Sequence, residues 1–172
     1  NNMISVRIDR RRKFPVTTLL RVFSFSTDEE ILQAFSDEKK TQDFLLPTLE
    51  KDQTKSTQEA LIEFYQKLRP GEPVVLENAQ DLVTNMFFNQ RRYNLGKVGR
   101  FKINKRLGLT FPNSPENWVL KPQDLVAVIK YLVKLQNNEG AVDDIDHLAN
   151  RRLKRVGEQL TEGPFRVGFL RL

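Results

Sequence analysis

The side chains best suited to chemistry gather in one stretch, residues 142–155, VDDIDHLANRRLKR. Three aspartates and His147, the chain's single histidine, directly precede four cations there. Carboxylates beside an imidazole are the groups of acid–base and metal chemistry, whereas clustered arginines and lysines bind polyanions. The stretch therefore poses two alternatives, a metal or acid–base site and a surface that binds a polyanion.

Three interpretations of the acids in this stretch are open. The apolar spacing predicts a helix over 143–160, and on a helix Asp143 and His147 share one face at a spacing that suits a metal ion. The acids could instead complement the positive end of the helix dipole and cap its free N–H groups. In the third interpretation, Asp146 accepts hydrogen bonds from base amino groups and Arg151 donates to a guanine. At five residues apart on a helix, these two are expected to border one cleft, because direct pairing would be strained.

The other cations are clustered as well. The 172 residues carry 28 lysines and arginines against 22 acids, a net charge of +6, and this excess favours an anionic partner. Residues 7–13, RIDRRRK, hold five cations and one acid, which suits either solubility or phosphate contact. Residues 91–106 hold seven cations and no acid. Like charges repel at i,i+4 on a helix. A run of seven cations is therefore harder to explain as a helix face that only contacts solvent, and it favours an anionic partner.

Several classes of function lack the residues that they need. The absence of cysteine excludes disulfides, zinc ribbons and thiol nucleophiles. One histidine, no G-x-S-x-G and no Walker lysine motif leave little from which to build a catalytic centre. No run of about 18 apolar residues is present to cross a membrane, and we expect no signal peptide.

Periodicity predicts a mainly helical scaffold for these residues. Thr27 with Glu30 and Ser56 with Glu59 form capping boxes, which mark the starts of two helices. The fold class is therefore α+β, mainly α-helical with about six helices and a small amount of strand. Helices are predicted over 14–23, 27–35, 56–68, 76–88, 122–135 and 143–160, and over the basic run 94–107 in spite of its glycines.

Two regions do not follow the helical period. Residues 4–8 alternate apolar and polar side chains, which predicts a short strand with no evident partner in the chain. Residues 36–55 are mixed and polar and contain Pro47, which is expected to break a helix. We interpret them as a connection, with a hairpin through FLLPTL.

Four long blocks resemble successive segments of the bacterial RNA polymerase beta subunit, in the family's order. These blocks are VRIDRRRK (6–13), EALIEFYQKLRPGEP (59–73), NMFFNQRRYNLGKVGRFKINKRLGL (85–109) and VDDIDHLANRRLKRVGE (142–158), and FRVGFLR (165–171) is similar to the block that follows. The resemblance implies a beta lobe over residues 1–150 and a helix over 151–172 that leads toward the protrusion. Gly163-Pro164 interrupts that normally continuous helix, and Ala149 stands where the family usually has glycine.

The resemblance implies a module that contacts DNA. The family's lobe helps to enclose the DNA cleft, holds the non-template strand of the transcription bubble and contacts the downstream duplex. The family's pocket for a flipped non-template base falls on Asp146 and Arg151, and further contacts to that strand fall on Arg69 and Arg92. Basic residues that line the same channel match Arg10, Arg11 and Arg12.

The resemblance also implies the partners of this module. The rest of beta, the beta-prime, alpha and omega subunits and a sigma factor would surround it, in the cytoplasm at the nucleoid. The family's catalytic magnesium is held by aspartates of beta-prime, so this chain is expected to bind no cofactor and to be inactive alone. The alternatives are a stand-alone helical DNA-binding regulator, which would place 144–160 in a major groove, and a metal-dependent nuclease.

Overall fold

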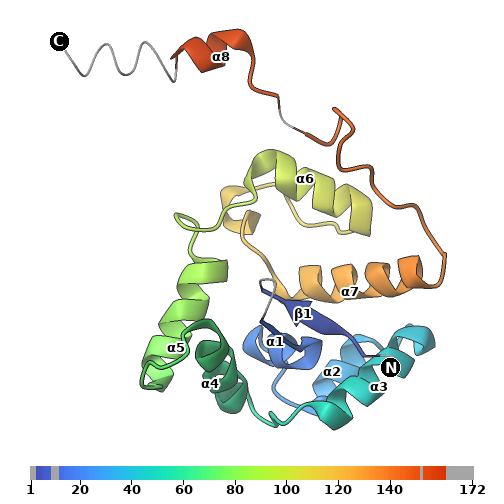
Figure 1. The fold of residues 1–172 in the computed structure, drawn as a ribbon. Coiled ribbons are helices and arrows are strands. Elements are labelled where there is room, and N and C mark those ends of the chain that lie inside the picture. The colour runs from blue at the N-terminus through green and yellow to red at the C-terminus, as the bar shows by residue number, and fades with distance from the viewer. Residues whose placement is uncertain (1–2, 9–11, 152, 162–172) are drawn as a thin grey trace. The chain divides into compact units, whose positions relative to one another are not determined.

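The computed structural model of the chain describes residues 3–8, 12–151 and 153–161. This part contains eight α-helices, a two-stranded sheet, a π-helical segment and a 3-10 turn (Figure 1), which confirms the mainly helical α+β class. The chain divides into two compact units, Asn1–Glu139 and Gly140–Leu172. Among the described residues, no helix combines the length and apolar character needed to cross a membrane.

The first unit contains the sheet and seven of the helices. The strands are β1 (Ser5–Arg7) and β2 (Lys13–Pro15). The helices are α1 (Val16–Val22), α2 (Asp28–Ala34), α3 (Lys39–Lys51), α4 (Thr57–Leu68), α5 (Leu76–Val83), η1 (Thr84–Phe88, π-helical), α6 (Gly96–Leu107), η2 (Pro115–Asn117, 3-10) and α7 (Pro122–Gln136).

The first strand has a partner within the chain. β1 pairs antiparallel with β2, and Val6 lies opposite Phe14. The expectation that residues 4–8 lack a partner is therefore wrong. Strand β2 is hard to predict from the sequence because it is three residues long and ends in Pro15, which also forms the N-cap of α1.

Helix α1 lies at the centre of the first unit, and all seven of its residues are buried. Leu19 and Val22 belong to one apolar cluster with residues of α4 and α5, whereas Val16 and Leu20 belong to a second cluster with residues of α2, α3 and α7. Because both sides of α1 are covered, its polar side chains need internal partners. Thr17 and Thr18 both donate to the buried carboxylate of Asp52.

The connection and hairpin predicted over 36–55 are wrong, because α3 occupies most of that range and contains Pro47. The buried positions of α3 are Thr41, Leu45, Thr48 and Leu49, a spacing that matches one helical face. Two threonines in this stripe make it look polar in the sequence. The burial of Leu45 and Leu49 compensates for the hydrogen bond that proline removes.

Two predicted capping boxes can be compared with the observed helix starts. Before α2, Thr27 and Glu30 exchange both capping hydrogen bonds. Before α4, the Ser56 side chain accepts from the Glu59 N–H, whereas Glu59 accepts from the N–H of Lys55. Both predicted helix starts are confirmed. In the second box the Glu59 carboxylate accepts from the N–H of Lys55 and not from that of the N-cap residue Ser56.

The second unit contains α8 (Val156–Leu160) as its one helix within the described residues. The predicted helix over 143–160 is therefore wrong at residues 143–151 and 153–155, which are not helical. Gly163 and Pro164, where we expected an interruption, lie outside the described residues.

Burial of α3 predicts a sharp difference between two adjacent leucines. Leu45 is fully buried, whereas Leu46 is 48% exposed. Leu45→Ala should lower the free energy of unfolding by about 2–5 kcal/mol, because it removes core contacts and leaves a cavity, and Leu46→Ala should change it by less than about 1 kcal/mol. Urea denaturation measures both, and equal effects would contradict a helix at this place.

Candidate nucleic-acid interface

The basic run over 91–106 contains one arginine that faces inward. Arg100 of α6 is fully buried, and its Nη1 and Nη2 donate to the two carboxylate oxygens of Asp124 at 2.7 and 2.9 Å. Its remaining donors reach the backbone carbonyls of Asn117 at 2.5 Å and Val119 at 2.7 Å. Arg100 therefore stabilises the packing of α6 and is not available to a ligand.

The inward position of Arg100 leaves the opposite side of α6 exposed. Lys97 and Lys105 are exposed, as are the apolar side chains of Val98 and Phe101. Two further bonds hold this face in place. The Asn104 amide donates to the carbonyl of Phe111 and the Asn113 amide to that of Lys97, at 2.7 and 2.8 Å. The exposed face of α6 thus combines cations with an aromatic ring, a combination suited to single-stranded nucleic acid.

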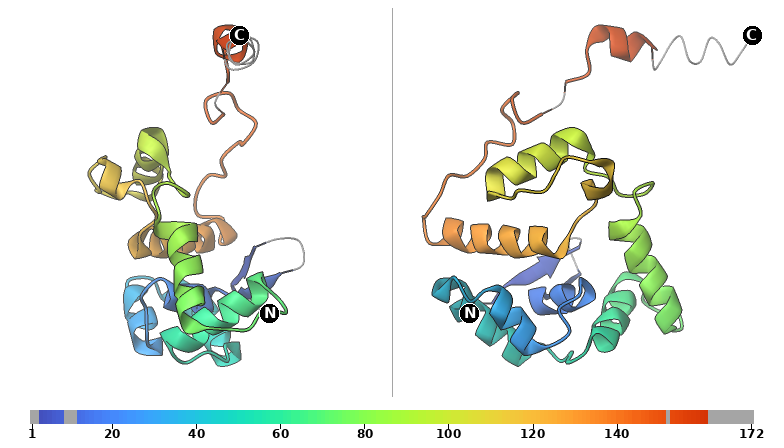
Figure 2. Two further views of the ribbon diagram at one scale, coloured as in Figure 1. Left: turned by 90° about the vertical axis from the view of Figure 1, so that its left-hand side faces the viewer. Right: turned by 180° about the vertical axis from the view of Figure 1, so that it is seen from behind.

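Arg69 and Arg92 line one polar hollow in the first unit. Arg69 follows the last residue of α4, and Arg92 lies in the turn after η1, where its N–H donates to the carbonyl of Asn89 at 2.9 Å. Helices α4 and α5 lie side by side, as both figures of the ribbon show (Figures 1 and 2), and this packing brings the two arginines together. The α4–α5 hollow has a volume of about 360 Å³ and is lined by Tyr65, Arg69, Glu72, Asn78, Asp81, Leu82, Asn85 and Arg92.

Glu72 organises one wall of the α4–α5 hollow. Its carboxylate accepts from the hydroxyl of Tyr65 at 2.8 Å and from Nη1 of Arg69 at 3.2 Å. The pKa of Glu72 lies below its usual value, chiefly because of the hydrogen bond from Tyr65 and secondly because of the one from Arg69. The same Tyr65–Glu72 bond raises the pKa of Tyr65. Arg69 is therefore held at the wall by an exposed ion pair, which is weak enough to be exchanged for a ligand.

Of the three arginines expected to line the channel, Arg12 is described, and Arg10 and Arg11 lie outside the described residues. Arg12 is half-buried, and its Nη1 donates to the carbonyl of Leu68 at 2.7 Å. That carbonyl belongs to the last turn of α4, where free acceptors and the helix dipole favour a cation. Arg12 thus has a structural contact beside Arg69.

Asp146 and Arg151 form a direct ion pair in the second unit. Nη1 of Arg151 lies 3.3 Å from Oδ1 of Asp146, and the two side chains are 60% and 83% exposed. The expectation that direct pairing would be strained is wrong, because the chain between them is not helical. The pair presents one carboxylate and one guanidinium together to solvent.

Asp144 and His147, on either side of Asp146, stabilise turns. Oδ1 of Asp144 accepts from the N–H of Asp146 at 3.0 Å, and Nδ1 of His147 accepts from the N–H of Ala149 at 3.1 Å. Such local bonds compete with helix formation, and the exposed Ile145 of this segment gains nothing from packing. Among the residues that the structure describes, no group of three or more acids and histidines lies close enough to hold a metal ion.

Three polar residues of the α4–α5 hollow were not predicted from the sequence, namely Asn78, Asp81 and Asn85. Their spacing of three and four places them on one helical face, opposite the buried Ala79 and Val83. That spacing is visible in the sequence, but it does not show that the face lies against Arg69 and Arg92.

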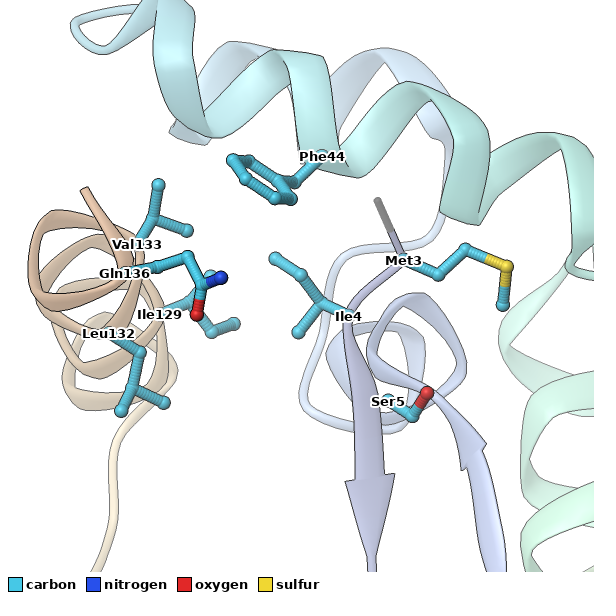
Figure 3. Close-up of a pocket in the computed structure, with 8 residues that line it drawn as sticks. All are labelled: Met3, Ile4, Ser5, Phe44, Ile129, Leu132, Val133 and Gln136. Atoms are coloured by element: carbon cyan, nitrogen blue, oxygen red, sulfur yellow. The ribbon is translucent and has the colours of Figure 1, made fainter. Parts of the chain in front are cut away.

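A second hollow, of about 310 Å³, lies between the N-terminal strand, α3 and α7 (Figure 3). Ile4, Phe44 and Ile129 point into it, and none of its eight lining residues carries a charge. It lacks the groups that would bind a phosphate or read a base edge, so we do not include it in the interface.

The Arg100–Asp124 pair predicts a large loss of stability on truncation. Asp124→Ala should lower the free energy of unfolding by about 3–5 kcal/mol, because a buried guanidinium loses its counter-charge. Asp37→Ala is the matched control, since Asp37 is 83% exposed in its ion pair with Lys130, and it should cost less than about 1 kcal/mol. Chemical denaturation measures both, and similar losses would contradict the anchoring role of Arg100.

The hydrogen bonds of Glu72 predict its titration. Tyr65→Phe should raise the pKa of Glu72 toward its ordinary value, and by more than Arg69→Ala, because the Tyr65 hydroxyl is the larger cause of the lowered pKa. Since the pKa is lower in the folded state, the stabilisation is present above the unfolded pKa and is lost as the pH falls through the folded pKa. An NMR pH titration of the Glu72 carboxyl measures this, and an unchanged pKa in Tyr65→Phe would refute it.

Comparisons with known proteins place the chain in a family. Residues 1–154 match the family model described as RNA polymerase Rpb2, domain 2. The chain is 46% identical over 170 residues to the DNA-directed RNA polymerase subunit beta of Syntrophomonas wolfei, and 43% identical over 174 residues to that of Dehalococcoides mccartyi. Each match covers 99% of this chain but only 15% and 14% of the relative. The chain therefore belongs to the bacterial DNA-directed RNA polymerase beta subunit family and contains its Rpb2 domain 2.

Proposed function

We propose that this chain is the DNA-contacting lobe of a bacterial RNA polymerase beta subunit, which encloses the DNA cleft and holds the non-template strand of the transcription bubble. One observation carries the proposal. Arg69 and Arg92, which the resemblance assigns to the same DNA strand, line a single hollow although they come from different elements. Two guanidinium groups at one hollow suit a strand of linked phosphates better than they suit an isolated small molecule.

The charges at the hollow support strand binding. The side chain of Arg92 forms no hydrogen bond or ion pair with another residue in the described part of the chain, so its donors can reach a phosphate. Arg69 is held by Glu72 through an exposed pair, so the cost of exchanging Glu72 for a phosphate is small. Arg12, beside Arg69, adds a further positive charge at the end of α4.

The Asp146–Arg151 pair supports a second contact, to a flipped base of the same strand. Both side chains are exposed, so a base can replace their mutual ion pair at little cost. The carboxylate would accept from a base amino group and the guanidinium would donate to the acceptors of guanine. On a surface that bound only phosphates, the negative charge of Asp146 would repel the ligand.

The whole enzyme supplies what this chain does not. We propose that the other parts of beta, the beta-prime, alpha and omega subunits and a sigma factor surround the lobe in the cytoplasm. The family resemblance assigns catalytic magnesium to aspartates of beta-prime. The chain would thus contribute DNA contacts to nucleotidyl transfer and no reacting group.

The stand-alone regulator is the less favoured alternative. It requires a recognition helix over 144–160 that can enter a major groove. Within the described residues 153–161, α8 has five residues, and residues 143–151 form turns and coil. The structure therefore does not provide that helix.

Strand binding at the hollow predicts different effects for two adjacent arginines. In the polymerase that contains this chain, Arg92→Ala should weaken binding to bubble DNA of any sequence by roughly tenfold and reduce the salt dependence by about one counterion. Arg91→Ala is the matched control, because Arg91 is exposed but does not line the hollow. Binding at several salt concentrations measures both, and equal losses would count against the hollow as the contact.

Base reading at the Asp146–Arg151 pair predicts a change of preference. Asp146→Ala should abolish the preference for a guanine-containing non-template strand over a guanine-free strand, a preference worth about 1–3 kcal/mol. Arg155→Ala, in the same unit, is the control. It should weaken the binding of both strands equally, because it removes a charge without removing a base contact. If Asp146→Ala also weakened the binding of both strands equally, the proposed base pocket would be wrong. Asp146 would then only stabilise the local turn.

A further inference from the structure

The lining of the α4–α5 hollow is mixed in charge, and phosphate binding does not account for this. Besides Arg69 and Arg92, the hollow contains the carboxylates of Glu72 and Asp81. A carboxylate repels a phosphate, but it accepts hydrogen bonds from the amino and imino groups of a base. The presence of both signs therefore indicates a ligand that offers donors as well as acceptors.

Several hydrogen-bonding groups in the hollow remain available. In the described part of the chain, the side chains of Asn78 and Asp81 form no hydrogen bond or ion pair. Oδ1 of Asn85 accepts from Nδ2 of Asn89 at 3.0 Å, which leaves the amide N–H groups of Asn85 to donate. Asp81 thus supplies acceptors and Asn85 supplies donors on the same wall.

These groups stand on a rigid support. Asn78, Asp81 and Asn85 share one face of α5 and η1, and the opposite face is fixed in the core by Ala79 and Val83. The backbone changes to π-helical geometry at Thr84–Phe88, with the Asn89 N–H donating to the Thr84 carbonyl at 2.9 Å. Such π segments are frequent at functional sites, and a packed helix holds polar groups more accurately than a loop does.

The hollow also has the size and the walls for a planar ring. Its volume of about 360 Å³ lies at the lower end of the range of about 300–1,000 Å³ that is typical of small-molecule sites. The half-buried side chain of Leu82 provides apolar surface beside the polar groups. A base that is removed from its stack needs such a surface to replace the stacking that it loses.

We infer that the α4–α5 hollow holds one unstacked base of the DNA strand, and that Asp81 accepts a hydrogen bond from the exocyclic amino group of that base. The inference rests on the proposed strand binding and adds a base site distinct from the Asp146–Arg151 pair. Asn85 donates to the acceptors of the base, and Arg69 and Arg92 bind the adjoining phosphates. Adenine, guanine and cytosine carry the amino group that Asp81 requires, and thymine does not.

An abasic scan of the non-template strand tests the inference in the polymerase that contains this chain. Each base of the bubble is removed in turn, and binding is measured for wild type, Asp81→Asn and Glu77→Gln. Glu77 is the matched control, because it is an exposed acid of α5 that does not line the hollow. In wild type and Glu77→Gln, removing one particular base, or replacing it by thymine, should weaken binding by roughly tenfold. In Asp81→Asn that loss should become clearly smaller, because a neutral amide oxygen accepts a weaker hydrogen bond than a carboxylate does.

The outcomes separate the two proposals. The sensitive position should differ from the position that responds to Asp146→Ala. If no position shows a loss that depends on Asp81 while Arg92→Ala still weakens binding to all DNA, the base site is wrong and strand binding stands. If Arg92→Ala also has no effect, the proposed function itself fails at this hollow, and the base site fails with it.

Discussion

The bidentate pair of Arg100 and Asp124 is the constraint on which the basic part of the first unit depends. Four hydrogen bonds from one buried guanidinium join α6 to α7 and to the loop between them through Asn117 and Val119. An unpaired charge at this depth would cost several kcal/mol, so α6 cannot rotate about its axis without losing the pair. The exposed lysines and Phe101 of α6 are directed outward for that reason. The seven cations of the run are therefore not seven equivalent contacts, since Arg100 is buried and fixes the orientation of the cations that share α6 with it.

The candidate DNA contacts have two different physical supports. The α4–α5 hollow lies on α4, which packs on the fully buried α1, and on α5, which packs on α4, so its polar groups are held by the core. The Asp146–Arg151 pair lies in a segment of turns whose apolar neighbours, such as Ile145, are exposed. The hollow is therefore organised before a ligand arrives, whereas the pair gains little stability from its own geometry. At both places a DNA strand would have to exchange an exposed ion pair, Arg69–Glu72 at the hollow and Asp146–Arg151 in the second unit.

Much of the fold could be predicted from local signals, because they coincide with the tertiary arrangement. The capping residues Thr27 and Ser56 and the apolar periods of the later helices predicted α2, α4, α5 and α7. The failures have separate causes. In α3 the buried stripe contains threonines such as Thr48, whose hydroxyl donates to the Phe44 carbonyl at 2.7 Å, and so it looks polar. Over 143–151, where the apolar spacing predicts a helix, side chains instead form hydrogen bonds with nearby backbone N–H groups. The site could be predicted in part: Arg69 and Arg92 came from the family resemblance, but their convergence depends on the packing of α4 against α5, which no local pattern contains.

The most direct test of the central claim is a double-mutant cycle between Arg69 and Arg92 for binding of bubble DNA by the polymerase that contains this chain. If both arginines hold one stretch of the same strand in one hollow, the two losses should not be additive, and the interaction energy should reach about 0.5–3 kcal/mol. If the two losses add to within about 0.5 kcal/mol, the arginines act independently. Additive losses would contradict the account of the α4–α5 hollow as a single site for the DNA strand.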